Sequence, residues 1–280
     1  MRSLLYCPAN SPKMLTHVGI YGADAIVFDL EDAVTEDEKD EARDLLVEYL
    51  SHMDYGEAEL IVRINSFDSV YGKADLQAMI PLHKAIIRIP KVETAAEIRH
   101  TEAYVQELEK QYSLTPGSTK FHILLETPLG IERAFSLAGA SDRIAALAFG
   151  AEDYCRATGI KRIGEPYALD YVRSRLVSAA GAYGIACFDS VWGVLSDSEG
   201  LEKESHRSRT LGFNGKSVIH PDQVAIVNRI FSFSEEEILW ARRILHEAAN
   251  GVSEVDGRMV DVPVIAQARR IINESGEEST

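Results

Sequence analysis

Hydrophobic and polar residues alternate in blocks along the chain. Short apolar runs recur, and between them lie longer segments in which apolar residues return every three or four positions. Runs of the first kind are typical of strands covered on both faces of a parallel sheet, and the second spacing predicts amphipathic helices. The pattern predicts eight strands, at residues 3–9, 25–31, 60–65, 85–90, 121–127, 144–150, 185–191 and 215–220.

Several helices carry end signals in the sequence. Thr35 followed by Glu38 has the spacing of a capping box and predicts a helix over residues 36–50. Pro221 suits the first turn of a helix after the eighth strand. Further helices are predicted at 94–112, 235–249 and 263–273, the last two joined by the turn-rich loop 250–263.

Eight strands that alternate with helices predict an α/β fold, a (β/α)8 TIM barrel with a C-terminal helical extension or lid. The rival is a doubly wound open sheet, which usually has fewer strands and a glycine-rich first turn. The first turn here, PANSPKM, contains no glycine, so the barrel is favoured. We expect a barrel domain over residues 1–232 and a helical extension and lid over residues 233–280.

Charge and cysteine content narrow the classes of protein. The chain has 29 Lys and Arg against 44 Asp and Glu, a formal net charge of −15, which argues against nucleic-acid binding. Its N-terminal apolar run is too short for a signal peptide and no run reaches transmembrane length, so we expect no membrane association. Three cysteines without metal-type spacing predict reduced thiols and a cytoplasmic location.

Polar residues gather at the predicted carboxyl ends of the strands, where TIM barrels hold their active sites. The set is rich in acids and contains one arginine, one lysine and one asparagine: Asp29, Glu31, Asp32, Arg63, Asn65, Lys91, Glu126, Glu152, Asp153 and Asp189. Converging carboxylates repel one another unless a cation neutralises them. The sequence therefore predicts an acidic mouth that needs a positive partner.

Glu126 and Asp153 follow adjacent strands and fit a magnesium site. Carboxylate oxygens without His or Cys suit this hard cation, which takes one or two protein carboxylates and keeps water or substrate at its other positions. The alternative is that each acid caps the helix that follows it. Glu152 is expected to turn away and serve the start of its helix.

The two cations also have two interpretations each. Arg63 within a buried strand needs an anionic partner, which is either Asp29 or Glu31 in a structural ion pair or a bound substrate. Lys91 could form an imine with a carbonyl substrate, but a lysine at a strand end more often makes a salt bridge.

The motifs DAIVFDLEDAV, LLETPLGI, ALAFGAEDY, GFNGKSVIHPDQV and DGRMVDVPVIAQAR together resemble the citrate lyase beta-subunit family. This family lies within the HpcH/HpaI aldolase superfamily, which also contains malyl-CoA and citramalyl-CoA lyases. The resemblance runs from residue 2 to about residue 270. It implies a TIM barrel and a Mg²⁺-dependent carbon–carbon lyase that acts on an acyl-CoA or acyl-carrier-protein thioester.

The resemblance also implies roles for particular residues. Glu126 and Asp153 match the metal ligands, and Glu126 thereby contributes to substrate binding as well. Arg63 matches an arginine that contacts the substrate or its enolate. Asp29, Glu31 and Asp32 match acids that hold this arginine and metal-bound waters.

Two further positions follow from the resemblance. Asp261 matches a lid aspartate that reaches the site of a neighbouring subunit, and it is our candidate general acid; it also fits the N-cap of the next helix. Lys13 lies in the loop after the first strand, which in the family approaches the phosphates of the carrier.

The implied reaction is cleavage of a citryl thioester to oxaloacetate and an acetyl thioester. The alternatives are a malyl- or citramalyl-CoA lyase that yields glyoxylate or pyruvate with acetyl-CoA, a metal-dependent aldolase acting on free hydroxy-keto acids, and a non-catalytic assembly subunit. Family precedent implies a homo-oligomer, a trimer or larger, and association with other citrate lyase subunits is a further implied possibility.

Overall fold

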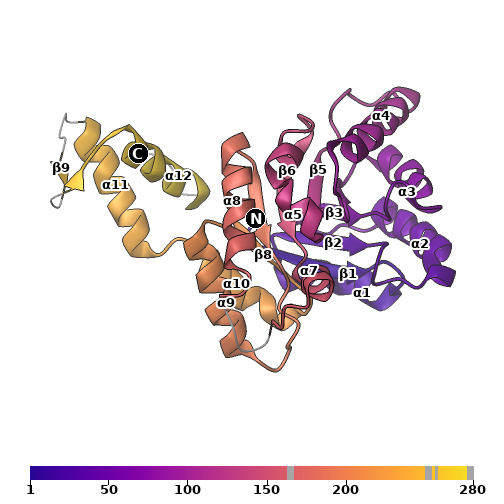
Figure 1. Ribbon diagram of the computed structural model, residues 1–280, viewed down its shortest axis with the longest axis horizontal. Helices are drawn as coiled ribbons and strands as arrows, with labels where there is room; N and C mark the ends of the chain where they lie inside the picture. The colour runs from indigo at the N-terminus through magenta and orange to yellow at the C-terminus, as the bar shows by residue number, and fades with distance from the viewer. Residues whose placement is uncertain (163–166, 250–253, 256–257, 276–280) are drawn as a thin grey trace. The chain divides into compact units, whose positions relative to one another are not determined.

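The computed structural model describes residues 1–162, 167–249, 254–255 and 258–275. It forms two compact units, residues 1–229 and 230–280. In the first unit eight parallel strands close into a barrel in chain order, because β1 pairs with both β2 and β8 (Figure 1). The strands are β1 (Ser3–Pro8), β2 (Ala25–Asp29), β3 (Glu59–Arg63), β4 (Ile86–Ile89), β5 (Phe121–Leu125), β6 (Ile144–Phe149), β7 (Ala186–Asp189) and β8 (Gly215–Val218). The predicted (β/α)8 barrel is confirmed.

Helices connect successive strands around the barrel, as crossovers between parallel strands require, and one more helix follows the last strand (Figure 1). They are α1 (Pro12–His17), α2 (Lys39–His52), α3 (Gly72–Met79), α4 (Ala95–Gln111), α5 (Pro128–Glu132), α6 (Ala134–Ala138), α7 (Ala151–Thr158), α8 (Asp170–Tyr183), α9 (Ser198–Leu211) and α10 (Pro221–Phe231). Short 3-10 turns lie at Val18–Tyr21, Glu36–Glu38 and Ile80–Leu82. Helix α10 begins at Pro221, as predicted.

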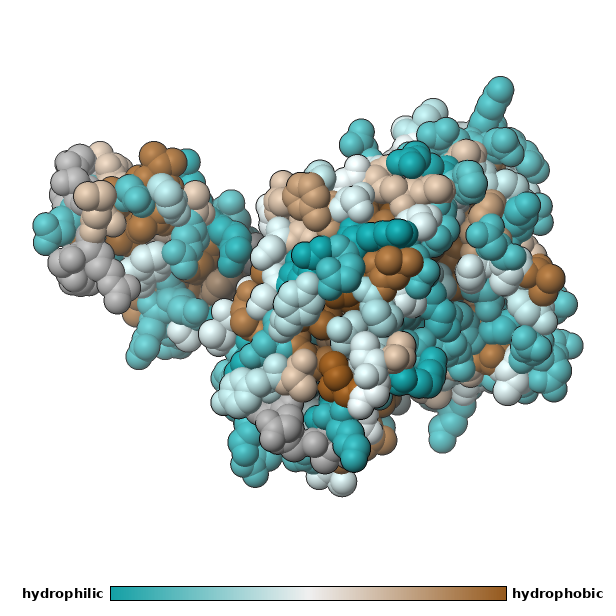
Figure 2. All heavy atoms as spheres, in the orientation of Figure 1, coloured by the Kyte–Doolittle hydropathy of each residue, from teal (hydrophilic) through white to brown (hydrophobic). Residues whose placement is uncertain are grey.

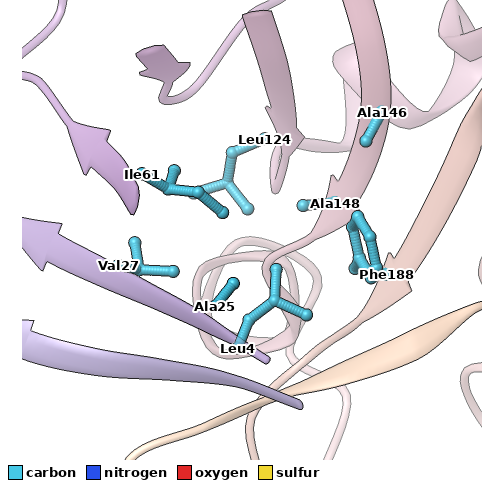
Figure 3. Close-up of a cluster of buried hydrophobic side chains, with 8 residues drawn as sticks. All are labelled: Leu4, Ala25, Val27, Ile61, Leu124, Ala146, Ala148 and Phe188. Carbon is cyan, nitrogen blue, oxygen red and sulfur yellow. The ribbon is translucent and has the colours of Figure 1, made fainter. Parts of the chain in front are cut away.

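Side chains that alternate along the strands fill the barrel interior. They come from six strands, and Figure 3 shows them converging on a common centre. The cluster contains Leu4, Ala25, Val27, Ile61, Leu124, Ala146, Ala148 and Phe188. Because side chains of a strand point to opposite faces in turn, residues in step with this cluster point inward all the way to the carboxyl end of their strand. This alternation decides which polar residues reach the opening of the barrel at the carboxyl ends of the strands, which we call the mouth.

The predicted capping box at Thr35 does not form. Thr35 Oγ1 bonds the Glu38 side chain, not a backbone amide; residues 36–38 form a 3-10 turn, and α2 begins at Lys39. The Glu38 carboxylate instead accepts a hydrogen bond from Asn10 Nδ2 at 2.7 Å. The competing tertiary contact explains why the local signature failed. At α4, Thr94 does cap the helix by accepting from the Glu97 amide.

The second unit has its own core. Helices α11 (Glu235–Ala249) and α12 (Val262–Ser275) supply most of a buried apolar cluster formed by Ala241, Ile244, Val255, Val260, Ala268, Ile271 and Ile272. The segment between the helices was predicted to be a loop, but it contains two short antiparallel strands, β9 (Glu254–Val255) and β10 (Arg258–Met259). Residues 250–253 and 256–257 of that loop lie outside the described residues.

Hydrophilic residues cover most of the face shown in Figure 2, with apolar residues scattered among them. This distribution is usual at the surface of a folded protein. Among the described residues, no helix is both long enough and apolar enough to cross a bilayer. The three cysteines, Cys7, Cys155 and Cys187, are free and buried, as their spacing predicted.

Candidate functional site at the carboxyl ends of the barrel strands

A cavity of about 380 Å³ opens at the carboxyl ends of the strands. Most of the acids predicted for the mouth meet there, together with Arg63. Its polar lining residues are Tyr6, Asp29, Asp32, Arg63, Glu126, Glu152, Asp153, Ser190 and Ser217. Residues far apart in sequence are joined here because the closed barrel brings all eight strand ends to one rim.

Arg63 is held by a carboxylate on the neighbouring strand. Asp29 and Arg63 are in register across β2 and β3, and two hydrogen bonds join them, Nε to Oδ1 at 2.7 Å and Nη2 to Oδ2 at 2.5 Å. Its Nη1 lies 3.0 Å from Glu31 Oε2. Burial alone would lower the pKa of Arg63, but Tyr6, Asp29 and Glu31 raise it well above its ordinary value. The arginine is thus a fixed positive charge in the cavity wall.

Lys91 neutralises the acids on the other side of the mouth. Its Nζ lies 2.6 Å from Glu31 Oε1, 3.0 Å from Asp32 Oδ1 and 3.6 Å from Asp153 Oδ2. Burial would lower the pKa of Lys91, but its hydrogen bonds to Glu31 and Asp32 raise it, so the amine stays protonated and cannot attack a carbonyl. The salt-bridge interpretation is confirmed.

The backbone at Lys91 is left-handed, with φ of 52°. A non-glycine residue in this conformation costs roughly 1–3 kcal/mol, which surrounding contacts must offset. The same residue supplies two contacts to the site, because its amide also donates to Glu126 Oε1 at 3.0 Å. The left-handed turn therefore lets one residue hold acids from three strands.

Glu126 is the most strongly perturbed carboxylate of the mouth. It follows β5, is 4% exposed, and its burial raises its pKa to about 8, with Glu31 and Asp153 adding to the rise. Gly150 leaves space for this side chain: a Cβ there would lie 2.4 Å from both Cβ and Oε2 of Glu126. The glycine of the GAED motif is therefore explained by the neighbouring strand.

The two acids after β6 have different surroundings. Helix α7 starts at Ala151, and its first turn points Asp153 into the mouth, where the side chain is 14% exposed and accepts from Arg156 at 2.7 Å. The Glu152 side chain is 61% exposed and pairs with Arg162. The two acids differ in exposure and partner, as expected, but Glu152 also lines the cavity, so the prediction that it turns away from the mouth is wrong.

The acids present fit a small hard cation better than a transition metal. No group of three or more His, Cys, Asp or Glu side chains suited to a metal occurs in the part of the chain that the structure describes. Glu126 and Asp153 nevertheless share a cavity, and their charges repel enough to raise the pKa of Glu126. Two carboxylates with room for water and substrate oxygens are the usual protein contribution to a Mg²⁺ site.

Asp189 does not belong to the mouth, contrary to the prediction. It is fully buried on the outer side of β7, where it accepts from Arg173, Ser208 and Lys216. Although burial would raise its pKa, Arg173 and Lys216 hold it below the usual value. The reason is that successive side chains of a strand point to opposite faces. Phe188 points into the barrel core, so its neighbour Asp189 points outward.

Two predicted residues lie away from the contacts described so far. Lys13 is exposed on α1, next to Met14, which lines the cavity. Asp261 is in the second unit, where its Oδ1 accepts from the Val264 amide at 3.1 Å and caps α12. The N-cap interpretation of Asp261 is confirmed, and its role as a general acid stays a prediction.

Several residues of the site were missed by the analysis of the sequence. Tyr6 lies beside Arg63, whose guanidinium carbon is 5.1 Å from the ring centre, and its hydroxyl accepts from the buried Arg88 at 2.9 Å. Ser190 Oγ accepts from the amide of Ala151 at 3.0 Å and so fixes the start of α7. Strand parity alone could have placed Tyr6 in the barrel, since it is two residues after Leu4.

Comparison with known proteins agrees with this geometry. Residues 2–221 match the family model described as HpcH/HpaI aldolase/citrate lyase. The citrate lyase subunit beta of Leuconostoc mesenteroides subsp. cremoris is 40% identical over 97% of this chain and 92% of its own length. A (3S)-malyl-CoA thioesterase of Cereibacter sphaeroides is 36% identical over 97% of this chain and 93% of its own.

A solved structure gives the same result. The protein CitE of Mycobacterium tuberculosis, in complex with magnesium, acetoacetate and coenzyme A, superposes with a TM-score of 0.78 at 30% identity, covering 99% of this chain and 98% of that one. The matches span nearly the whole chain, including both strand ends that carry Glu126 and Asp153. The chain therefore belongs to the HpcH/HpaI aldolase/citrate lyase family.

Proposed function

We propose that this protein is a Mg²⁺-dependent carbon–carbon lyase that cleaves a citryl thioester to oxaloacetate and an acetyl thioester. The observation that carries the proposal is the meeting of Glu126, Asp153 and the Asp29-anchored Arg63 in one cavity. The 40% identity to a citrate lyase beta subunit and the magnesium and coenzyme A in the related CitE structure support it.

The residues fit a retro-aldol cleavage. Glu126 and Asp153 would hold the ion, which supplies Lewis-acid polarisation of the substrate's hydroxyl and carboxylate oxygens. Transfer of the hydroxyl proton to a general base turns the hydroxyl-bearing carbon into the carbonyl of the keto acid as the carbon–carbon bond breaks, and the electron pair of that bond passes to the thioester carbonyl as an enolate. Arg63, fixed by Asp29, stabilises the charge that appears on that oxygen.

Protonation of the enolate carbon completes the reaction and gives the acetyl thioester. We propose Asp261 for this step on the strength of the family resemblance, and Lys13 as a contact to the phosphates of the carrier. Glu31 and Asp32 keep Arg63 and Lys91 in place through the ion pairs described above. We also propose that the protein is a homotrimer, on the strength of the family resemblance. We propose a cytoplasmic location as well, which the buried free thiols support.

An assay of the purified protein with Mg²⁺ separates the candidate substrates. Citryl-, citramalyl- and malyl-CoA are supplied in turn, and the keto acid and the acetyl-CoA are both measured. We expect citryl-CoA to give the highest kcat/KM; equal or greater activity with malyl-CoA would favour the second candidate. That candidate rests on the 36% identity to the malyl-CoA enzyme. Release of free CoA without a keto acid would indicate thioester hydrolysis instead.

A further inference from the structure

Ser190 and Val191 line the cavity, and the segment 190–192 that they form with Trp192 is held from behind by side chains from three different parts of the chain. Each successive carbonyl oxygen of this segment accepts a hydrogen bond from one of them. The donors are Lys216 Nζ to Ser190 O at 2.5 Å, Arg162 Nη2 to Val191 O, and Gln223 Nε2 to Trp192 O at 3.0 Å. A loop in which three carbonyls in a row are bonded by side chains has little freedom to move.

The cations behind the segment form a buried cluster. Lys216 is fully buried, and the Arg162 side chain is 12% exposed. Glu204 joins them, because its Oε1 accepts from Lys216 at 2.7 Å and from Arg162 at 2.8 Å. Replacing such a cluster by apolar side chains is often neutral or stabilising, so stability alone does not explain it. Its specific effect is on the conformation of segment 190–192.

Within the described part of the chain, the amides of Val191 and Trp192 have no protein acceptor. All described peptide bonds are trans, so each N–H points away from the carbonyl of the same peptide. The carbonyls of Ser190 and Val191 are drawn to Lys216 and Arg162, which turns the amides of Val191 and Trp192 to the opposite side. Among the hydrogen bonds of the described residues, neither amide is a donor. Ser190 and Val191 line the cavity.

The charged side chains behind the segment are nearly balanced. The buried cluster contains three cations, Arg162, Arg173 and Lys216, against two carboxylates, Asp189 and Glu204. The remaining acidic partner of Arg162 is the largely exposed Glu152. With Glu152 counted, cations and carboxylates are equal in number, and Glu152 itself lines the cavity, so the fixed amides and not a surplus of charge favour an anion here.

We propose that Lys216, Arg162 and Gln223 are positioning residues that hold segment 190–192 so that the amides of Val191 and Trp192 bind a carboxylate oxygen of the substrate. Amide donors fixed in advance bind an anion without the cost of ordering a loop. The inference rests on the proposed function only in requiring a substrate with a carboxylate. The three side chains act through the backbone and do not touch the substrate.

Kinetics of the Lys216→Met variant test the proposal, with Lys203→Met as the matched control. Lys203 is an exposed lysine of α9 that pairs only with Glu199 in the described part of the chain. With citryl-CoA and Mg²⁺, we expect Lys216→Met to raise KM at least tenfold and to change kcat less than threefold. An interaction made equally in ground and transition states has this signature, whereas loss of folded protein lowers kcat and leaves KM unchanged.

Arg162 provides a conservative rescue. Arg162→Lys keeps the charge beside Glu204 but cannot keep all of the arginine's hydrogen bonds, so its KM should lie between those of the wild type and Arg162→Met. If Lys216→Met does not fold, Gln223→Met is measured in its place. This substitution removes only the bond to Trp192 O and the bond to the Ile219 amide, and it should raise KM about threefold. Unchanged KM in a folded variant would overturn the proposal.

Hydrogen exchange measured by mass spectrometry on residues 190–197 gives a readout that needs no turnover. Oxaloacetate with Mg²⁺ should slow exchange there in the wild type and in Lys203→Met, and should have little effect in Lys216→Met. Absence of slowing in the wild type would contradict the binding role of the amides. A wild type that binds oxaloacetate in this way but cleaves no thioester would refute the proposed function and leave the inference standing.

Discussion

Binding of Mg²⁺ to the free protein should release a proton, and the proton should come from Glu126. This carboxylate is 4% exposed, and burial raises its pKa to about 8, with the charges of Glu31 and Asp153 contributing. A metal ligand must be ionised, so at neutral pH the ion has to displace the proton. Raising the pH removes that competition, and substitution of Glu126 removes the titrating group.

The size of the effect follows from the pKa. With a pKa of about 8, Glu126 is protonated in about 0.9 of the molecules at pH 7, in about half at pH 8 and in about 0.1 at pH 9. Those fractions are the expected numbers of protons released for each ion bound. Removing the proton at pH 7 weakens binding about tenfold, so apparent Mg²⁺ affinity should rise about tenfold from pH 7 to pH 9 and then level off.

Isothermal titration calorimetry in two buffers of different ionisation enthalpy measures the proton count directly. The slope of the observed enthalpy against the buffer enthalpy should fall from about 0.9 at pH 7 to about 0.1 at pH 9. Glu126→Gln should abolish the slope, and the control Glu199→Gln, an exposed acid of α9, should leave it unchanged. A slope near zero at pH 7 in the wild type would refute the assignment of Glu126 as a buried, protonated ligand.

Three other predictions follow. The raised pKa of Glu126 makes the wild type lose stability as the pH rises from about 4.5 to 8. Urea unfolding in EDTA should therefore show that Glu126→Gln raises the free energy of unfolding by up to ~5 kcal/mol at pH 8.5 and hardly at all at pH 4.5. Arg63→Lys should lose the paired bonds to Asp29 and lower kcat about a hundredfold while calorimetric Mg²⁺ affinity stays unchanged. Gly150→Ala should displace Glu126 and weaken Mg²⁺ binding at least tenfold, whereas Gly181→Ala, whose Cβ meets nothing, should not.

The barrel was predictable because its signal is repeated eight times. Most strands are apolar runs, and an error in one of them would not have changed the fold. The capping box at Thr35 shows the opposite case: a single local signature failed because Asn10, distant in sequence, takes the Glu38 side chain. Local patterns cannot include such a competitor, since nothing in the sequence near Glu38 announces it.

The acids of the mouth were predictable as a group, but their partners were not. Lys91 holds Glu31, Asp32 and Asp153 through a left-handed backbone that no sequence rule assigns to a lysine. Gly150 likewise has its reason on the neighbouring strand, where Glu126 needs the space. Both features depend on the packing of one strand end against another, which exists only once the barrel has closed.

Strand parity would have corrected the main error about the site. Asp29 and Arg63 are two residues beyond Val27 and Ile61, and Glu126 is two beyond Leu124, so all three point inward with the core. Asp189 is one residue beyond Phe188 and must point outward, where Lys216 meets it. The alternation that identifies the core thus also sorts the polar residues at each strand end into those that face the substrate and those that support the wall from behind.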